Sequence, residues 1–226
     1  VNIVKEHLLS FTSDGDIVLD FFSGSATTAH AVMQLNAESK DSTRRKFIMV
    51  QLAEDLDKNY EKASADEKTV IKRSIDFLDS IGKPHYLTEI GKERIRRAGK
   101  KIKEEYKDKP GIENLDIGFR VLKLDSSNMK EVYYTPEEYA QMSFNLEGFM
   151  DNIKPDRTEE DLLFQVMLDL GIPLSAKIRQ DGETFYVNDN YLIASFGRVD
   201  TALITEISKK KPYYAVFRDS SFINDS

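Results

Sequence analysis

Residues 16–32 read DIVLDFFSGSATTAHAV, and this stretch decides the fold. The apolar run at 17–19 is typical of a parallel strand that is covered on both faces. The small residues at 23–26 allow a sharp backbone turn and the close approach of a ligand. Thr27 and Thr28 are suited to begin the helix that follows. The pattern therefore predicts a strand, a turn and a helix N-terminus, the arrangement that holds a cofactor in open α/β sheets.

The glycine pattern alone leaves two interpretations open. Small-residue turns also join strands to helices in α/β domains that bind nothing at that point. The dinucleotide fingerprint G-x-G-x-x-G is absent, because Gly24 stands alone where three glycines are expected. No Lys follows the turn as it does in a phosphate-binding loop, which argues against a nucleoside triphosphate.

Four separated segments resemble one known family. Residues 20–32 resemble the S-adenosylmethionine motif of amino-group DNA methyltransferases, in the form typical of the modification subunits of type III restriction-modification systems. Residues 44–52 (RRKFIMVQL) resemble the second cofactor strand of that subunit. Residues 116–128 (DIGFRVLKLDSSN) and 211–222 (KPYYAVFRDSSF) resemble two segments peculiar to it. Because all four occur in the right order, the resemblance is specific and covers essentially the whole chain.

The resemblance implies an α/β fold with two parts. Residues 1–106 are expected to hold the C-terminal half of a methyltransferase domain, as a partial Rossmann-like sheet. Residues 110–226 are expected to form a smaller α+β C-terminal domain. The boundary is placed at Lys109-Pro110-Gly111, where charge, proline and glycine occur together.

The same resemblance assigns the cofactor-binding residues. Asp20 and the turn from Phe22 to Ser25 are expected to line the methionine and sugar side of S-adenosylmethionine, and Gln51 is expected to bind the ribose. The alternative for Gln51 is a polar residue at a strand end that faces solvent. The complete predicted set is Asp20, Phe22, Ser23, Gly24, Ser25, Thr27, Thr28 and Gln51. The family usually has Gly where this chain has Ala26, and a methyl group there is expected to weaken cofactor binding.

No residue of this chain is assigned a catalytic role. The family carries an Asp-Pro-Pro-Tyr type motif on the N-terminal side of the cofactor motif, and the chain has no Asp-Pro or Pro-Pro pair. We therefore expect the C-terminal part of a longer adenine-specific DNA methyltransferase, inactive by itself. The expected partners of the full subunit are DNA, the restriction subunit and a second copy of the modification subunit. Two alternatives are a non-catalytic interaction or dimerisation module and an S-adenosylmethionine-dependent methyltransferase that acts on a substrate other than DNA.

Composition sets further bounds. The 226 residues include no Cys and only three His, at 7, 30 and 85, which indicates neither a disulfide framework nor a metal site. No apolar run approaches the roughly 20 residues of a membrane span, and a cytoplasmic location is expected. The net charge of −7 counts against strong DNA binding by this chain alone. The basic stretch at 94–103 is expected to be a solvated helix face, with contact to the DNA backbone as the alternative.

Periodicity predicts the remaining elements. Residues 53–68 are charged and poorly periodic, which indicates a mobile loop, whereas 119–124 alternate as a half-buried strand does. A helix is expected to begin at Thr135-Pro136. Three strands, a helix and a strand are expected to close the chain. The aromatic residues in these strands are expected to serve the core or strand pairing rather than base stacking; they are Phe185, Tyr186, Tyr191, Phe196, Tyr213, Tyr214 and Phe217.

Overall fold

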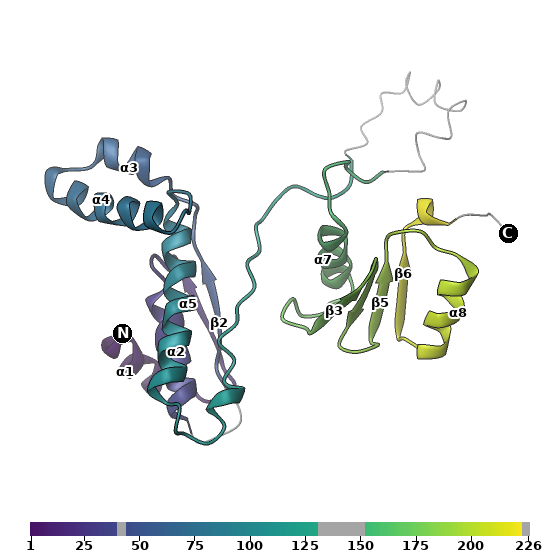
Figure 1. The fold of residues 1–226 in the computed structure, drawn as a ribbon, viewed down its shortest axis with the longest axis horizontal. Helices are drawn as coiled ribbons and strands as arrows, with labels where there is room; N and C mark the ends of the chain where they lie inside the picture. Colours follow the sequence, from purple (N-terminus) through teal and green to yellow (C-terminus); the bar gives the residue numbers. More distant parts are fainter. Residues whose placement is uncertain (40–43, 131–151, 223–226) are drawn as a thin grey trace. The chain divides into compact units, whose positions relative to one another are not determined.

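The computed structural model describes residues 1–39, 44–130 and 152–222. These residues form two compact units, Val1–Phe119 and Arg120–Ser226 (Figure 1). Each unit contains a sheet with helices packed on it, so the chain is mixed α/β as predicted. The helix predicted to begin at Thr135 lies outside the described residues.

The first unit is built on a strand–helix–strand element. Strand β1 (Ile17–Phe21) pairs in parallel with β2 (Lys46–Val50), and helix α2 (Thr27–Glu38) connects them. Helix α5 (Leu87–Glu105) packs beside α2, and α1 (Asn2–Phe11) contacts α2 as well. The buried core of this unit lies between α2, α5 and one face of the sheet; it contains Ala29, Met33, Ala98 and Ile102, with Phe47 and Met49 from β2. The parallel pairing predicted from residues 16–51 is therefore confirmed.

The other face of the two-stranded sheet is open. In the register of the pair, Leu19 lies opposite Ile48 and Phe21 opposite Val50. Because side chains alternate along a strand, these four residues and Ile17 share one face. All five are exposed, with Leu19 at 54% and Ile48 at 50%. The prediction that this strand is covered on both faces is thus wrong for the described residues, where only the face that contains Val18 is buried.

The predicted loop at 53–68 is also wrong. Helix α3 (Leu56–Lys62) and the start of α4 (Ala65–Ser80) occupy it. The Asp55 carboxylate accepts hydrogen bonds from the backbone N–H groups of Asp57 and Lys58, which caps α3. Glu67 accepts from the backbone N–H of Ser64 at 2.9 Å, which caps α4. The caps and the buried side chains of Leu56 and Leu78 hold these helices in place. Because the rest of the stretch at 53–68 is largely exposed, its sequence shows no clear apolar periodicity.

The division between the units lies beyond the break at Lys109-Pro110-Gly111. A short 3-10 helix, η1 (Ile112–Asn114), follows that break, and Ile112 and Leu115 are buried in the first core. Ile117 and Phe119 pack partly against the same core. These apolar side chains pack the segment after the break onto the first unit, so the boundary between the two units along the chain lies between Phe119 and Arg120.

The second unit contains a four-stranded sheet in the order β3-β4-β5-β6. The strands are β3 (Ile178–Asp181), β4 (Thr184–Val187), β5 (Leu192–Ser195) and β6 (Tyr214–Phe217). The β3–β4 and β4–β5 pairs are antiparallel, and β5–β6 is parallel. Helix α7 (Glu159–Asp169) packs on the face that contains Val187 and Leu192, while α8 (Thr201–Lys210) packs on the face that contains Tyr186 and Ile193. Every residue of the two central strands is buried.

The half-buried strand predicted at 119–124 does not form. These residues belong to no strand or helix, and Val121, Leu122 and Leu124 are exposed. Alternation of apolar and charged residues makes a strand only where a partner strand supplies the backbone hydrogen bonds, and neither of the described sheets extends to this segment. In the described part of the chain, no helix is long and apolar enough to cross a membrane.

Candidate functional site

The predicted site residues gather at one end of the β1–β2 sheet. Asp20 lies near the end of β1 and faces α2, because it alternates with the exposed Leu19 and Phe21. The Thr28 hydroxyl in the first turn of α2 donates a hydrogen bond to the Asp20 carboxylate at 2.6 Å. This bond joins the end of the strand to the start of the helix, and it holds the turn between them in a closed form.

Gln51 fixes the same turn from the second strand. Its side-chain oxygen accepts a hydrogen bond from the backbone N–H of Gly24 at 2.7 Å. The N–H of Ser23 donates to the carbonyl of Val50 at 3.0 Å, directly beside it. The Gln51 amide nitrogen is directed to the Glu54 carboxylate at 3.2 Å. Gln51 therefore organises the turn, a role for which the residue type at a strand end gives no specific signal.

Two residues of the turn adopt the left-handed backbone conformation. Gly24 has φ +52° and Ala26 has φ +59°. Gly24 reaches this conformation without strain, whereas the Cβ of Ala26 makes it costly, by about 1–2 kcal/mol. Ala26 is also buried, with Gly91 of α5 against it. A glycine at position 26 would adopt this conformation without that cost.

The outer side of the turn is open to solvent. A Cβ added at Gly24 would meet no other atom within 4 Å. Phe22 is 64% exposed beside it, and Ser23, Ser25 and Thr27 are partly exposed. An exposed aromatic ring, hydroxyl groups and a helix N-terminus can together receive a polar ligand that has a flat, apolar part.

Sequence reasoning missed the part played by α5. Gly91 lies in the first half of that helix beside the turn, where an added Cβ would lie 3.4 Å from the carbonyl oxygen of Gly24 and 3.5 Å from the Cβ of Ala26. An isolated glycine inside a helical pattern is the signal that could have revealed this packing.

On α2, burial lowers the pKa of His30, and the positive charge of Arg94 on α5 lowers it further. His30 is therefore neutral at neutral pH.

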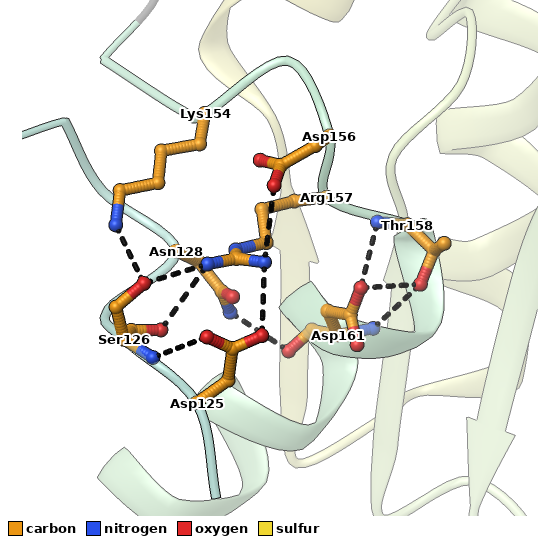
Figure 2. A network of polar contacts seen from close by, with 8 residues as sticks. All are labelled: Asp125, Ser126, Asn128, Lys154, Asp156, Arg157, Thr158 and Asp161. Carbon is orange, nitrogen blue, oxygen red and sulfur yellow. Dashed lines mark hydrogen bonds and ion pairs between the residues drawn. The ribbon is translucent and has the colours of Figure 1, made fainter. Parts of the chain in front are cut away.

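A second group of polar side chains lies in the other unit, and Figure 2 shows it. The Arg157 guanidinium contacts Asp125 at 3.3 Å and the Ser126 hydroxyl at 2.9 Å, and Lys154 donates to the same hydroxyl at 2.8 Å. The Asn128 amide donates to the carbonyl of Asp161 in α7 at 2.9 Å. The polar residues at 125–128, part of a segment that carries the family resemblance, thus tie the chain to the start of α7. Their role in this structure is to hold a loop.

Comparison with known proteins finds one matching family and two similar subunits. Residues 1–66 match the DNA methylase family. The chain is 34% identical over 150 residues to the Mod subunit of the type III restriction-modification enzyme EcoP15I from Escherichia coli. This alignment covers 59% of this chain and 18% of that subunit. It is 32% identical over 158 residues to the StyLTI Mod subunit from Salmonella typhimurium, which is 65% of this chain and 21% of that subunit.

The matched part of the chain thus spans about a fifth of the length of these curated relatives. The DNA methylase match includes both strands of the first sheet and the whole turn between β1 and α2. The resemblance predicted from the sequence is confirmed: the chain is similar to the modification subunits of type III restriction-modification systems, and its residues 1–66 match the DNA methylase family.

Proposed function

We propose that this chain supplies the cofactor-binding turn of an adenine-specific DNA methyltransferase, as part of a type III modification subunit. The observation that carries the proposal is the turn after β1, tied by Thr28 to Asp20 and by Gly24 to Gln51 inside the DNA methylase match. When bound, S-adenosylmethionine supplies the methyl group that passes to the adenine N6 atom. The adenine has to leave the duplex stack to be reached.

The turn fits S-adenosylmethionine on one side. The open space beside Gly24 leaves room for the ligand backbone, and the exposed ring of Phe22 offers an apolar surface. Asp20 keeps one carboxylate oxygen beyond its bond to Thr28, which suits a cationic ammonium group. Gln51 is the weakest member of the set, because Gly24 and Glu54 already engage its side chain. Ser23, Ser25 and Thr27 add hydroxyl donors and acceptors around the turn.

The exposed face of the β1–β2 sheet supports the same proposal. Parallel sheets are found with both faces covered, and the face formed by Ile17, Leu19, Phe21, Ile48 and Val50 is not. We propose that methyltransferase sequence outside the matched fifth of the subunit packs on it and brings the catalytic motif. DNA and the restriction subunit are then partners of that whole subunit, and a second modification subunit completes a homodimer.

A second candidate function is a non-catalytic interaction module. The same exposed apolar face favours it, since such surfaces mark interaction sites. The two candidates differ at the turn, because a module that only docks has no need of a cofactor site there.

Calorimetric titration of the chain with S-adenosylmethionine separates the two candidates. We expect weak binding, about millimolar or near −4 kcal/mol, because an open turn encloses only one side of the ligand. Asp20→Ala should weaken it about tenfold, which corresponds to about 1.4 kcal/mol. Asp16→Ala, at the opposite end of the same strand, is the matched control and should change nothing. Micromolar binding that survives Asp20→Ala would place the cofactor elsewhere in the chain.

Methyl transfer to duplex DNA tests where catalysis resides. We expect none from the chain alone, because its 226 residues contain no Asp-Pro-Pro-Tyr type motif, to which the resemblance assigns catalysis. Transfer of radiolabelled methyl groups above a control without protein would contradict this assignment. Transfer that appears only when the rest of a modification subunit is co-expressed with the chain would support it.

A further inference from the structure

The C-terminal unit presents stacked tyrosines at one end of its sheet. The rings of Tyr191 and Tyr213 are parallel within 4°, with centroids 5.2 Å apart. The edge of Tyr214 supports both rings. Tyr213 is 72% exposed and Tyr191 is 42% exposed. Of the aromatics expected to serve the core or strand pairing, Phe185, Tyr186 and Phe196 are buried, whereas Tyr191 and Tyr213 lie just before the paired strands β5 and β6 and stack on each other in contact with solvent.

Topology brings cationic residues to the same end of the sheet. Lys177 precedes β3, the hairpin at 188–191 joins β4 to β5, and Tyr213 precedes β6. Backbone hydrogen bonds connect these points in a row, from the Asn188 N–H to the Lys177 carbonyl at 2.9 Å and from the Tyr214 N–H to the Tyr191 carbonyl at 2.9 Å.

Helix α8 ends at the same end of the sheet, with Lys209 and Lys210 in its last turn, and Lys211 follows it. Among the described residues, Lys177, Lys209 and Lys211 are exposed and form no ion pair, so their charges face solvent.

A hollow of about 510 Å³ lies along β3, beside this end of the sheet. Its lining includes Arg120, Lys177 and Arg179. The Arg179 guanidinium lies 4.0 Å from the ring centre of Tyr186, which holds it in place. Asp189 also lines the hollow, and Asp181 lies 3.5 Å from Arg179. The cationic residues of the hollow and the lysines at the end of the sheet form one path, which leads from the hollow to the tyrosines and passes beside these two carboxylates.

We propose that this path binds single-stranded nucleic acid, with phosphates along Lys177, Arg179 and Lys211 and a base stacked on the exposed face of Tyr213. Exposed aromatic rings beside a cationic groove are the means by which proteins hold unpaired strands. A duplex presents no free base face to Tyr213, so it is the weaker ligand. The proposal concerns the second unit only, and it does not depend on the cofactor turn in the first.

Fluorescence anisotropy with a labelled 20-nucleotide oligo-dT tests the proposal on the whole chain. We expect binding at low salt that weakens as salt rises, with a log–log slope of about −0.7 for each phosphate that the protein neutralises. Tyr213→Ala should weaken binding about tenfold, the size of one base–aromatic stack, whereas Tyr213→Phe keeps the ring and should bind as the parent does. An abasic strand of equal length should bind the parent about as weakly as oligo-dT binds Tyr213→Ala.

Charge is tested by a matched pair of double variants. Lys177→Gln with Lys211→Gln should reduce the magnitude of the salt slope by about 1.4, the value expected for two neutralised phosphates. Lys100→Gln with Lys101→Gln removes the same charge from the basic helix α5 and should leave the slope unchanged. Thermal melts monitored by circular dichroism confirm that each variant folds.

Several results would overturn the proposal. One is no binding of oligo-dT at low salt, and another is equal binding by Tyr213→Ala and the parent. Binding of the matched duplex in preference to the single strand would also exclude it. So would binding of a proline-rich peptide with no binding of the oligonucleotide, because stacked tyrosines then serve a peptide groove.

Discussion

The two sheets of this protein differ in how many of their faces are covered. In the C-terminal unit, α7 covers one face and α8 the other, and every residue of β4 and β5 is buried. In the N-terminal unit, α2 and α5 cover one face of β1 and β2, and the other face exposes apolar side chains along both strands. The first sheet carries the turn that we propose binds the cofactor, whereas the second sheet is covered on both faces within the described residues.

This difference shows that burial, rather than strand sequence, distinguishes the two units. The runs IVLDF in β1 and LIAS in β5 are both apolar at most positions. Only the second is buried at every position, because helices lie on both of its faces. Side-chain truncations on these strands therefore give a direct measure of what each face contributes.

The largest expected difference is between two leucines. Leu192→Ala in β5 removes a side chain that is fully buried and should lower the free energy of unfolding by about 3 kcal/mol. Leu19→Ala in β1 removes a half-exposed side chain and should change it by less than about 0.5 kcal/mol. Chemical denaturation with hydrogen exchange followed separately for each unit measures both.

Two further truncations control that comparison. Met33→Ala, in the covered core of the first unit, should cost about as much as Leu192→Ala, because both side chains are fully buried. Leu168→Ala, on the exposed side of α7, should cost as little as Leu19→Ala. If Leu19→Ala were as destabilising as Met33→Ala, the first sheet would be covered in solution and the comparison would fail.

Each unit contains an arginine that holds a loop in place. In the first unit, Arg45 donates to the Thr12 hydroxyl at 2.9 Å and forms an ion pair with Asp14. In the second, Arg157 holds Asp125 and Ser126 (Figure 2). Replacing either by Ala should cost about 2 kcal/mol, because charged hydrogen-bond partners lose their donor. Hydrogen exchange should rise only in the unit that carries the substitution, and a loss of protection in both units would show that they unfold together.

The sequence predicts the first sheet and most of the second well. Residues 16–51 carry strong local signals, an apolar run and a small-residue turn, and the parallel β1–β2 pair follows from them. The errors have physical causes. At 53–68, helices α3 and α4 are held by caps such as Asp55, which a test for apolar period does not see. At 119–124, alternation predicts a strand although the described sheets give it no partner.

The candidate site is partly predictable from the sequence as well. Small residues at 23–26 indicate the turn, but the bonds that shape it connect residues far apart in the chain. The hydrogen bond from the Gly24 N–H to the Gln51 side-chain oxygen depends on tertiary structure, and so does the packing of Ala26 against Gly91. The exposure of Leu19 and Phe21 could not be predicted either, because apolar residues by themselves do not reveal what covers them.

A smaller effect is expected where the turn meets α2. Ala26→Gly should be close to neutral, because relief of the left-handed backbone, about 1–2 kcal/mol, is offset by the lost burial of a methyl group and the greater freedom of glycine when unfolded. Ala29→Gly, one turn further in the same helix, has no such relief and should lower the free energy of unfolding by about 1–2 kcal/mol. Equal losses for the two variants, measured by denaturant titration, would show that the backbone at Ala26 is unstrained.

The smallest effect is the response of the two units to pH. All three histidines lie in the first unit, at 7, 30 and 85, so histidine titration acts on that unit alone. Hydrogen bonds that the Asp79 and Asp57 carboxylates accept from its ring raise the pKa of His85 above its ordinary value of 6.5. Its stabilising contribution is full below pH 6.5 and is lost as pH rises through the raised pKa. Burial lowers the pKa of His30, so its contribution is full above pH 6.5 and is lost as pH falls through the lowered pKa.

The two histidines therefore oppose each other, and their combined contribution to the stability of the first unit should be greatest near pH 6.5. The amplitude is small, because the Asp57 and Asp79 carboxylates that contact His85 are largely exposed and solvent screens them. Proton NMR titration of the ring signals of His85 and His30 should give a pKa above 6.5 for His85 and below 6.5 for His30. Asp79→Asn removes a charged partner and should lower the pKa of His85 while leaving that of His30 unchanged. If the signals of His30 and His85 shifted together in this variant, the two histidines would be coupled. The pH dependence of stability could then not be assigned separately to His30 on α2 and to His85 in the α3–α4 region.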